Sequence, residues 1–372
     1  MQLPTRDYMN RIKPFFRIAV INLVLMLAVV GLIVAFPIGI KIGFDTVSPL
    51  IGPLSQESER YLYPNYAEVG WAKQHFKDLE DVSMTYRDKI VWKADPLESP
   101  TITVKADGLR RVIQVQEPNP DGLLLFGGST MWGMGTDDAN TIPSLLAQLS
   151  MREVVNHAQP GYLSRQALNA LVDSYEADVL PAGTDRVIVF YDGVNEVAAK
   201  CKDDDTGWGA DEHSHESDLS PVAVFRPALH LLSKVQDAFD SRIFNSGYSC
   251  HTDQSRAEAV ARSLVNNWIS ADAIARQHGD RFLAVLQPVA FLSQTRLDHL
   301  NMNSEHWQTF AEQYHAVYPA IRRFAKEASI QYHDLSGVLD VDEYFYIDFC
   351  HLSQRGNWLL ASAMNNLVTD SR

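Results

Sequence analysis

Ser129 lies in the first of four short segments whose residue types suit acyl-transfer chemistry. The segment reads FGGSTMWG and follows an apolar run. Gly127 and Gly128 allow the backbone to turn tightly, which exposes the serine hydroxyl and places the serine N–H where an oxyanion can sit. No Gly-Lys-Ser/Thr follows, as a phosphate loop requires, and Met131 replaces the last glycine of a G-x-S-x-G turn. Ser129 is therefore a candidate nucleophile; the alternative is a helix-capping serine.

The next two segments offer hydrogen-bond donors after further apolar runs. NHAQPGY contains Gly161, whose N–H a loop can present, and YDGVNE contains Asn195. An asparagine amide that donates to a developing oxyanion contributes about 3 kcal/mol in acyl-transfer sites. The alternatives are an ordinary type II turn at Pro160–Gly161 and a capping asparagine.

The fourth segment, YIDFCHLSQRGN, places Asp348 and His351 three residues apart. Side chains at this spacing lie together in one turn of chain. The carboxylate can then accept from the imidazole Nδ1–H and leave Nε2 free as a general base. With 12 histidines in the chain, one such pair can arise by chance. The order of all four segments, rather than any one of them, predicts a site.

Strands alternate with helices from about residue 119, which predicts a parallel sheet covered on both faces by helices. The expected strands are 123–126, 153–156, 187–191, 282–288 and 330–333. The expected helices are 141–149, 165–180, one around 260–275, one around 310–324 and one from 352 onward. In such sheets ligand sites form at the carboxyl ends of the strands, where three of the four segments lie.

The four segments resemble, in the same order, the sequence blocks of the SGNH (GDSL-type) hydrolases, which are named for a Ser, a Gly, an Asn and a His. FGGST, NHAQPGY, GVNE and DFCH match the four blocks, and the resemblance covers about two-thirds of the chain. The first block reads Gly-Gly-Ser-Thr instead of Gly-Asp-Ser, a variation seen among bacterial envelope members. Glu196 stands where the family usually has an aspartate, and we expect it to alter packing more than chemistry.

The resemblance implies a three-layer α/β/α flavodoxin-like domain over residues 119–372, with an acidic insert at about 200–255. It implies Ser129 as nucleophile, His351 as general base and Asp348 as the carboxylate that orients the imidazole. The oxyanion hole would consist of the N–H groups of Ser129 and Gly161 and the Asn195 amide. No metal ion or organic cofactor is expected.

The amino-terminal region predicts a membrane anchor. Residues 18–40 contain no charged side chain, and a helix of this length spans about 35 Å, enough for a hydrocarbon core of about 30 Å. The run is longer than the apolar core of a cleaved signal peptide, and no A-x-A-like site follows Phe36. Residues 1–17 carry four basic and one acidic side chain, so this tail is expected in the cytoplasm. We therefore expect a single-pass inner-membrane protein whose catalytic domain is periplasmic or extracellular.

The whole chain carries a net charge of −14, which argues against a general nucleic-acid-binding protein. Residues 41–118 are expected to form a membrane-proximal segment with short strands at Thr101–Val104 and Arg111–Val115. Its tyrosines and tryptophans are expected to pack against the main sheet; glycan binding or a place at the membrane interface are the alternatives.

Three cysteines leave the redox state open. In an oxidising compartment Cys201 and Cys250 can form a disulfide, with Cys350 left over beside the candidate site. Three free buried thiols are the other possibility.

The sequence thus predicts a membrane-anchored serine esterase. Its expected substrates are ester groups, above all O-acetyl groups, on extracytoplasmic glycan or other envelope material, and its acidic body should disfavour anionic substrates. An envelope polysaccharide O-acyltransferase and a lipid esterase or lysophospholipase remain alternatives that use the same site. The non-enzyme alternative is a scaffold subunit of an envelope assembly.

Overall fold

The computed structural model describes residues 56–87, 90–177, 180–181, 185–203 and 247–370. The expected cytoplasmic tail (1–17), the expected anchor (18–40) and most of the acidic insert lie outside these ranges. Among the residues that are described, no helix is both long and apolar enough to cross a membrane.

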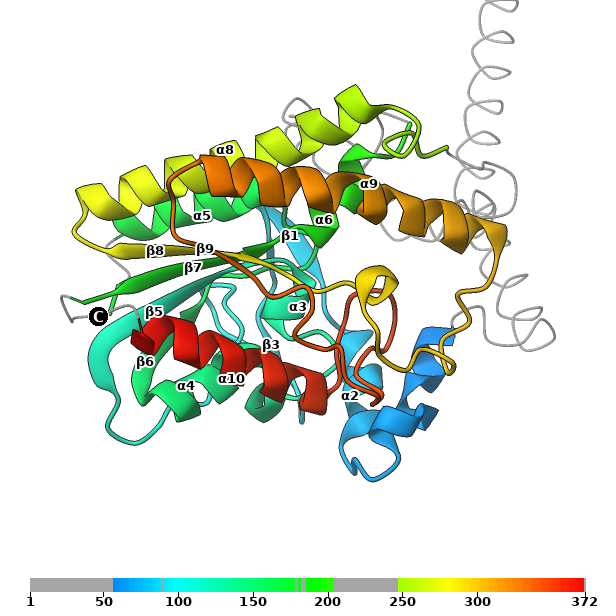
Figure 1. Cartoon of the computed structure of the whole chain (residues 1–372). Helices are drawn as coiled ribbons and strands as arrows, with labels where there is room; N and C mark the ends of the chain where they lie inside the picture. The colour runs from blue at the N-terminus through cyan, green and yellow to red at the C-terminus, as the bar shows by residue number, and fades with distance from the viewer. Residues whose placement is uncertain (1–55, 88–89, 178–179, 182–184, 204–246, 371–372) are drawn as a thin grey trace, which may run out of the picture. The chain divides into compact units, whose positions relative to one another are not determined.

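Five parallel strands form the central sheet (Figure 1). They are β5 (Asn119–Gly127), β6 (Arg152–Asn156), β7 (Val187–Asp192), β8 (Arg281–Leu286) and β9 (Tyr332–Asp334). Their order across the sheet is β6-β5-β7-β8-β9, and every neighbouring pair is parallel. Counted along the chain, this is the 2-1-3-4-5 order of flavodoxin-like sheets. The parallel α/β sheet expected from the sequence is confirmed.

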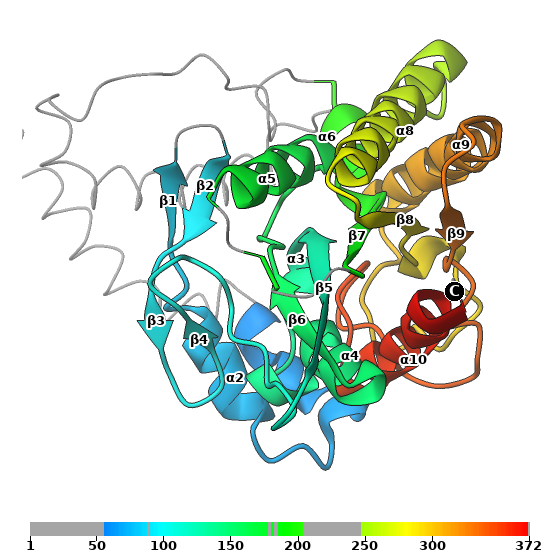
Figure 2. The ribbon, with the colours of Figure 1, turned by 90° about the vertical axis from the view of Figure 1, so that its left-hand side faces the viewer.

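Helices cover both faces of this sheet in the two views of Figures 1 and 2. One face carries α5 (Ser164–Glu176), α8 (Gln254–Gln277) and α9 (Glu305–Glu327), and the other carries α4 (Ile142–Ser150) and α10 (Gln354–Asp370).

Alternate side chains of β5 supply these two cores. Leu124 and Phe126 pack in the cluster with α5, α8 and α9, whereas Leu123 and Leu125 pack in the cluster with α4 and α10. All four side chains are completely buried. A strand that is buried on both faces has a continuous apolar sequence. For this reason LLLF predicted a strand although apolar and polar residues do not alternate in it.

The strand order brings the candidate segments to one place. β5 and β7 are neighbours in the sheet. The chain leaves β5 toward the edge strand β6, whereas it leaves β7 in the opposite direction, toward β8. Two short helices, α3 (Ser129–Trp132) and α6 (Val194–Lys200), begin directly after β5 and β7. The carboxyl ends of β5, β6 and β7 therefore meet at the switch point, where such sheets bind ligands.

Before β5 the chain forms small elements. They are η1 (Gln56–Leu62), η2 (Pro64–Tyr66), α2 (Ala72–Leu79), and two antiparallel pairs, β1 (Met84–Arg87) with β2 (Val91–Ala94) and β3 (Leu97–Glu98) with β4 (Thr103–Val104). Their aromatic side chains contact the loops of the sheet domain. The Trp92 indole N–H donates to the Pro160 carbonyl at 2.9 Å, and the Tyr66 hydroxyl donates to the Gly135 carbonyl at 2.5 Å. These contacts agree with the expectation that the segment packs against the main domain.

The expected strand at Arg111–Val115 is wrong, although Thr103–Val104 of the other expected strand is present. The Arg111 N–H does donate to the Thr103 carbonyl at 2.8 Å. Further along, however, the Ile113 N–H donates to the Ser144 hydroxyl, and the Gln114 side chain donates to the Val154 carbonyl. Of the backbone N–H groups in this stretch, only that of Arg111 bonds to a strand, and the next hydrogen bonds of the stretch involve side chains. Apolar alternation alone therefore did not specify a strand.

A disulfide joins Cys201 to Cys250, and Cys350 is a free, buried thiol. Both bridged cysteines are almost completely buried in the core beside α8. The structure thus selects the bridged alternative, and the bridge closes the acidic insert at its base.

Replacing both bridged cysteines by alanine should lower the free energy of unfolding by about 3 kcal/mol, because the bridge closes a loop across a separation of 49 residues. The measurement is denaturant unfolding of the full chain in detergent, with and without reductant. Reductant should destabilise the natural protein and leave the double variant unchanged. Equal unfolding midpoints for the two oxidised proteins would contradict the prediction.

Candidate active site

Ser129, His351 and Asp348 form a hydrogen-bonded row. Ser129 is the first residue of α3, and its Oγ lies 2.6 Å from His351 Nε2. His351 Nδ1 lies 2.7 Å from Asp348 Oδ2. Because a carboxylate only accepts hydrogen bonds, Nδ1 carries the proton shared with Asp348 and Nε2 accepts from the serine hydroxyl. This arrangement gives a base positioned to remove the serine proton.

Four donors surround the Asp348 carboxylate. Oδ1 accepts from the backbone N–H groups of Cys350 (2.9 Å) and His351 (2.8 Å). Oδ2 accepts from the His351 ring and from Arg60 Nη1 at 3.0 Å. Sequence reasoning missed Arg60, which is separated from Asp348 by 288 positions and lies in no recognisable motif.

These contacts keep Asp348 ionised. Burial by itself would raise the pKa of the carboxyl group, but the neighbouring His351 and Arg60 together outweigh that effect and hold the pKa below its ordinary value. The carboxylate therefore carries its charge throughout the neutral range. It can orient the imidazole and stabilise the imidazolium that forms when the serine loses its proton.

The predicted oxyanion donors lie beside the nucleophile. Asn195, in the first turn of α6, donates through Nδ2 to the carbonyl of Tyr162 at 2.8 Å. A Cβ atom on Gly128 would lie 2.3 Å from that same Nδ2, so the amide sits directly over the residue that precedes Ser129. Gly161 precedes Tyr162 and adopts a φ of +78°, a conformation that favours glycine. Within the described part of the chain, neither the Ser129 N–H nor the Gly161 N–H donates a hydrogen bond.

Glu196 joins the two loops that carry these donors. Its side chain is buried, Oε1 accepts from the Ser164 N–H, and Oε2 accepts from the Gly193 N–H at 3.3 Å. Ser164 follows the Gly161 loop and Gly193 precedes Asn195, so one carboxylate links both sides of the predicted oxyanion hole. This contact agrees with the expected packing role of Glu196.

A second buried acid, Asp192, lies close by. Burial, together with nearby Glu196, raises the pKa of Asp192 well above its ordinary value. The Trp268 indole N–H donates to Asp192 Oδ2 at 2.8 Å. The raised pKa favours the uncharged form of Asp192, which avoids the cost of a buried negative charge.

The donor atoms of Asp348, Cys350 and His351 lie within 4.8 Å of one another, close enough to be tested as a cation site. Their chemistry fits a cation poorly. Burial raises the pKa of the Cys350 thiol well above its ordinary value, so the sulfur keeps its proton. Arg60 already places a positive charge against Asp348. These groups suit proton transfer better than metal binding.

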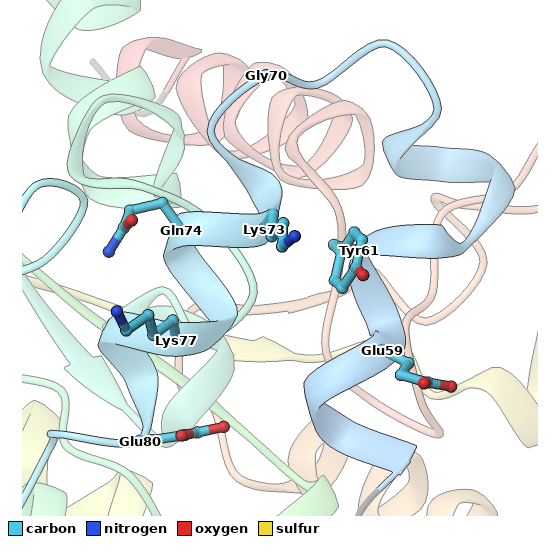
Figure 3. Close-up of a pocket in the computed structure, with 7 residues that line it drawn as sticks. All are labelled: Glu59, Tyr61, Gly70, Lys73, Gln74, Lys77 and Glu80. Carbon is cyan, nitrogen blue, oxygen red and sulfur yellow. The ribbon is translucent and has the colours of Figure 1, made fainter.

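A groove of about 610 Å³ lies apart from these residues, between η1 and α2 (Figure 3). Its lining residues are Glu59, Tyr61, Gly70, Lys73, Gln74, Lys77 and Glu80. Lys73 points toward Tyr61, with its Nζ 5.6 Å from the ring centroid. The five predicted site residues are not among those that line the groove.

Gly128→Ala should lower kcat for ester hydrolysis about 100-fold with little change in KM, because the new methyl group displaces the Asn195 amide from the oxyanion position. The measurement is steady-state hydrolysis of p-nitrophenyl acetate. Gly70→Ala is the matched control, since a Cβ there meets no atom within 4 Å. Unchanged kcat in Gly128→Ala would contradict the placement of Asn195.

Glu196→Ala should lower kcat about tenfold and destabilise the fold by about 2 kcal/mol, because it leaves two buried N–H groups without an acceptor. Kinetics and thermal unfolding together measure the two effects. Glu312→Ala removes an acid from an exposed pair with His251 and serves as control. A stability loss with kcat unchanged would show that Glu196 does not position the donors.

Similarity between this chain and known proteins is found among solved structures. No protein-family profile and no curated protein sequence matches the chain. Among solved structures, the chain is similar to a GDSL-like lipase from Bacteroides thetaiotaomicron, with 12% identity, 69% of this chain and 93% of that chain covered, and a TM-score of 0.37. It is also similar to a carbohydrate acetylesterase family member from Sinorhizobium meliloti, with 16% identity, 67% of this chain and 98% of that chain covered, and a TM-score of 0.38. For an extracellular lipase from Streptomyces rimosus the identity is 9%, the coverage is 66% of this chain and 99% of that chain, and the TM-score is 0.38. At these values the likeness decides nothing about activity, which depends on the side chains described above.

Proposed function

We propose that the protein is a membrane-anchored serine esterase of the SGNH type, with Ser129 as nucleophile. The observation that carries this proposal is the hydrogen-bonded row from Ser129 Oγ through His351 to Asp348. Three elements of an acyl-transfer site meet there: a nucleophile, a base and a carboxylate that orients the base. A scaffold subunit would have no need of this arrangement.

The geometry supports a two-step reaction. His351 Nε2 takes the serine proton while Ser129 Oγ attacks the ester carbonyl carbon. The developing oxyanion is held by the N–H groups of Ser129 and Gly161 and by the Asn195 amide. The protonated imidazole then gives its proton to the leaving alcohol. The alcohol departs, and the acyl group remains bound to Ser129 Oγ as an acyl-enzyme. A water molecule, deprotonated by His351, releases the acid and restores the serine.

Three features of the chain support the proposed compartment. The uncharged run at residues 18–40 supports an inner-membrane anchor, and the basic tail before it supports a cytoplasmic amino terminus. The Cys201–Cys250 disulfide supports an oxidising compartment for the catalytic domain. The proposed substrates are therefore ester groups, above all O-acetyl groups, on extracytoplasmic glycan or other envelope material. Transfer to a sugar hydroxyl and hydrolysis of lipid esters are alternatives that the same site permits.

Ser129→Ala should abolish labelling by a fluorophosphonate probe and reduce kcat by at least about 1000-fold, because no other group replaces the nucleophile. The protein is the full chain in detergent, with p-nitrophenyl acetate as substrate. Ser270→Ala is the matched control, since Ser270 is an exposed residue of α8 whose hydroxyl donates to the Asn266 carbonyl. Equal labelling of natural protein and Ser129→Ala would exclude the nucleophile.

A substrate panel separates the alternatives. It contains p-nitrophenyl acetate and butyrate, acetylated xylan and lysophospholipid, each with and without a sugar acceptor. Faster turnover of acetyl esters and release of free acetate support the glycan esterase. Acyl-sugar formation would favour the transferase, and turnover confined to long acyl chains would favour the lipid esterase.

A further inference from the structure

The segment that precedes the sheet domain reaches into the catalytic row. Arg60, in η1, forms an ion pair with Asp348 at 3.0 Å, and both side chains are only 15% exposed. Five residues on, Asn65 Nδ2 donates to the Tyr346 carbonyl at 2.9 Å. The chain that contains Arg60 and Asn65 therefore holds the loop that carries both Asp348 and His351 at two points.

The same segment also contacts the loop that follows the nucleophile. The Tyr66 hydroxyl donates to the carbonyl of Gly135, which follows α3 and its first residue, Ser129. Residues 60–66 thus connect the two parts of the chain that must meet for Ser129 Oγ to face His351. A one-ångström displacement of such groups is enough to cost about 100-fold in rate.

We propose that Arg60 is a positioning residue of the catalytic row, which acts on the His351 imidazole through the Asp348 carboxylate. This inference rests on the proposed function and adds a residue outside the four family-like blocks. Arg60 and the His351 ring both donate to Asp348 Oδ2, so together they fix the orientation of the carboxylate. The orientation of the carboxylate in turn fixes that of the imidazole.

The charge of Arg60 also acts on Asp348. The cation lies against the carboxylate and helps to hold the pKa of Asp348 below its ordinary value. Arg60 therefore helps to keep Asp348 ionised as well as oriented.

Among the described residues, Arg60 is the cation that contacts Asp348. Arg355 and Arg296 lie at the start of the loop, where they pair with Glu343 and Asp298. Four other titratable side chains that face the loop are neutral. They are Tyr66 from η2, Tyr314 from α9, Cys350 from the loop itself and His299. Burial raises the pKa of Tyr66, Tyr314 and Cys350 and lowers the pKa of His299. None of the four then carries charge near neutral pH.

Arg60 is not among the residues that line the groove. Glu59 and Tyr61, on either side of Arg60 in the sequence, line the groove of Figure 3, whereas Arg60 contacts Asp348. A substitution at Arg60 therefore alters the contact with the catalytic loop directly.

Two substitutions separate charge from hydrogen bonding in the full chain in detergent. Arg60→Gln keeps a donor and removes the charge, and Arg60→Lys keeps the charge. In Arg60→Gln kcat for p-nitrophenyl acetate should fall about 100-fold with KM unchanged, because the carboxylate loses the charged donor that orients it. In Arg60→Lys kcat should fall only about tenfold, because the charge remains and only the positioning is poorer. Arg276→Gln is the control, since it replaces an exposed arginine on α8, and it should change neither kcat nor KM.

A readout that needs no turnover keeps this inference distinct from the proposed function. In protein labelled with ¹⁵N-histidine, the His351 Nδ1–H signal is assigned with His351→Gln. Exchange of this proton with water should be faster in Arg60→Gln than in the natural protein or Arg60→Lys, because the carboxylate that accepts it is less firmly held. If the natural protein shows no Ser129-dependent hydrolysis, the proposed function fails, and the exchange rate still tests the role of Arg60. Identical exchange rates and identical kcat in the natural protein and Arg60→Gln would overturn the inference.

Discussion

The buried negative charge of Asp348 is the constraint on which the catalytic row depends. A carboxylate removed from water is costly unless donors compensate it, and the penalty reaches several kcal/mol when they are missing. Here two backbone N–H groups, one imidazole and one guanidinium provide that compensation. The same contacts fix the side chain so that the imidazole faces Ser129. Charge compensation and catalytic geometry are thus achieved by one set of hydrogen bonds.

The oxyanion side of the site depends on a second buried acid. Glu196 accepts N–H groups from the loops after β6 and β7, and so determines how the Gly161 loop lies relative to Asn195. Burial raises the pKa of nearby Asp192, which favours its uncharged form. One carboxylate, that of Glu196, thus joins two loops. The absence of a side chain on Gly128 completes the arrangement, since it leaves room for the Asn195 amide beside the nucleophile.

Most of the sheet could be predicted because its strands are apolar on both faces. The runs at 123–126, 153–156 and 187–191 became β5, β6 and β7, and two long amphipathic patterns became α8 and α9. Arg111–Val115 shows where that reasoning stops. Its alternation resembles a strand, but the partners of its backbone are the side chain of Ser144 and the carbonyl of Thr103. The alternation of apolar residues in a short segment does not reveal which group will bond to its backbone, because that depends on the rest of the fold.

The sequence by itself determined the kinds of groups at the site and the edge of the sheet where they would lie, because parallel strands bring their carboxyl ends together. Ser129, Gly161, Asn195, Asp348 and His351 all follow from local segments of this kind. Only the tertiary structure decided that Arg60 compensates Asp348, and that Cys201 pairs with Cys250. Contacts between residues far apart in the chain depend on how whole elements pack, and no short-range pattern records that packing. For this reason the four segments indicated the chemistry of the site, whereas no local segment indicated Arg60, the residue proposed to orient Asp348.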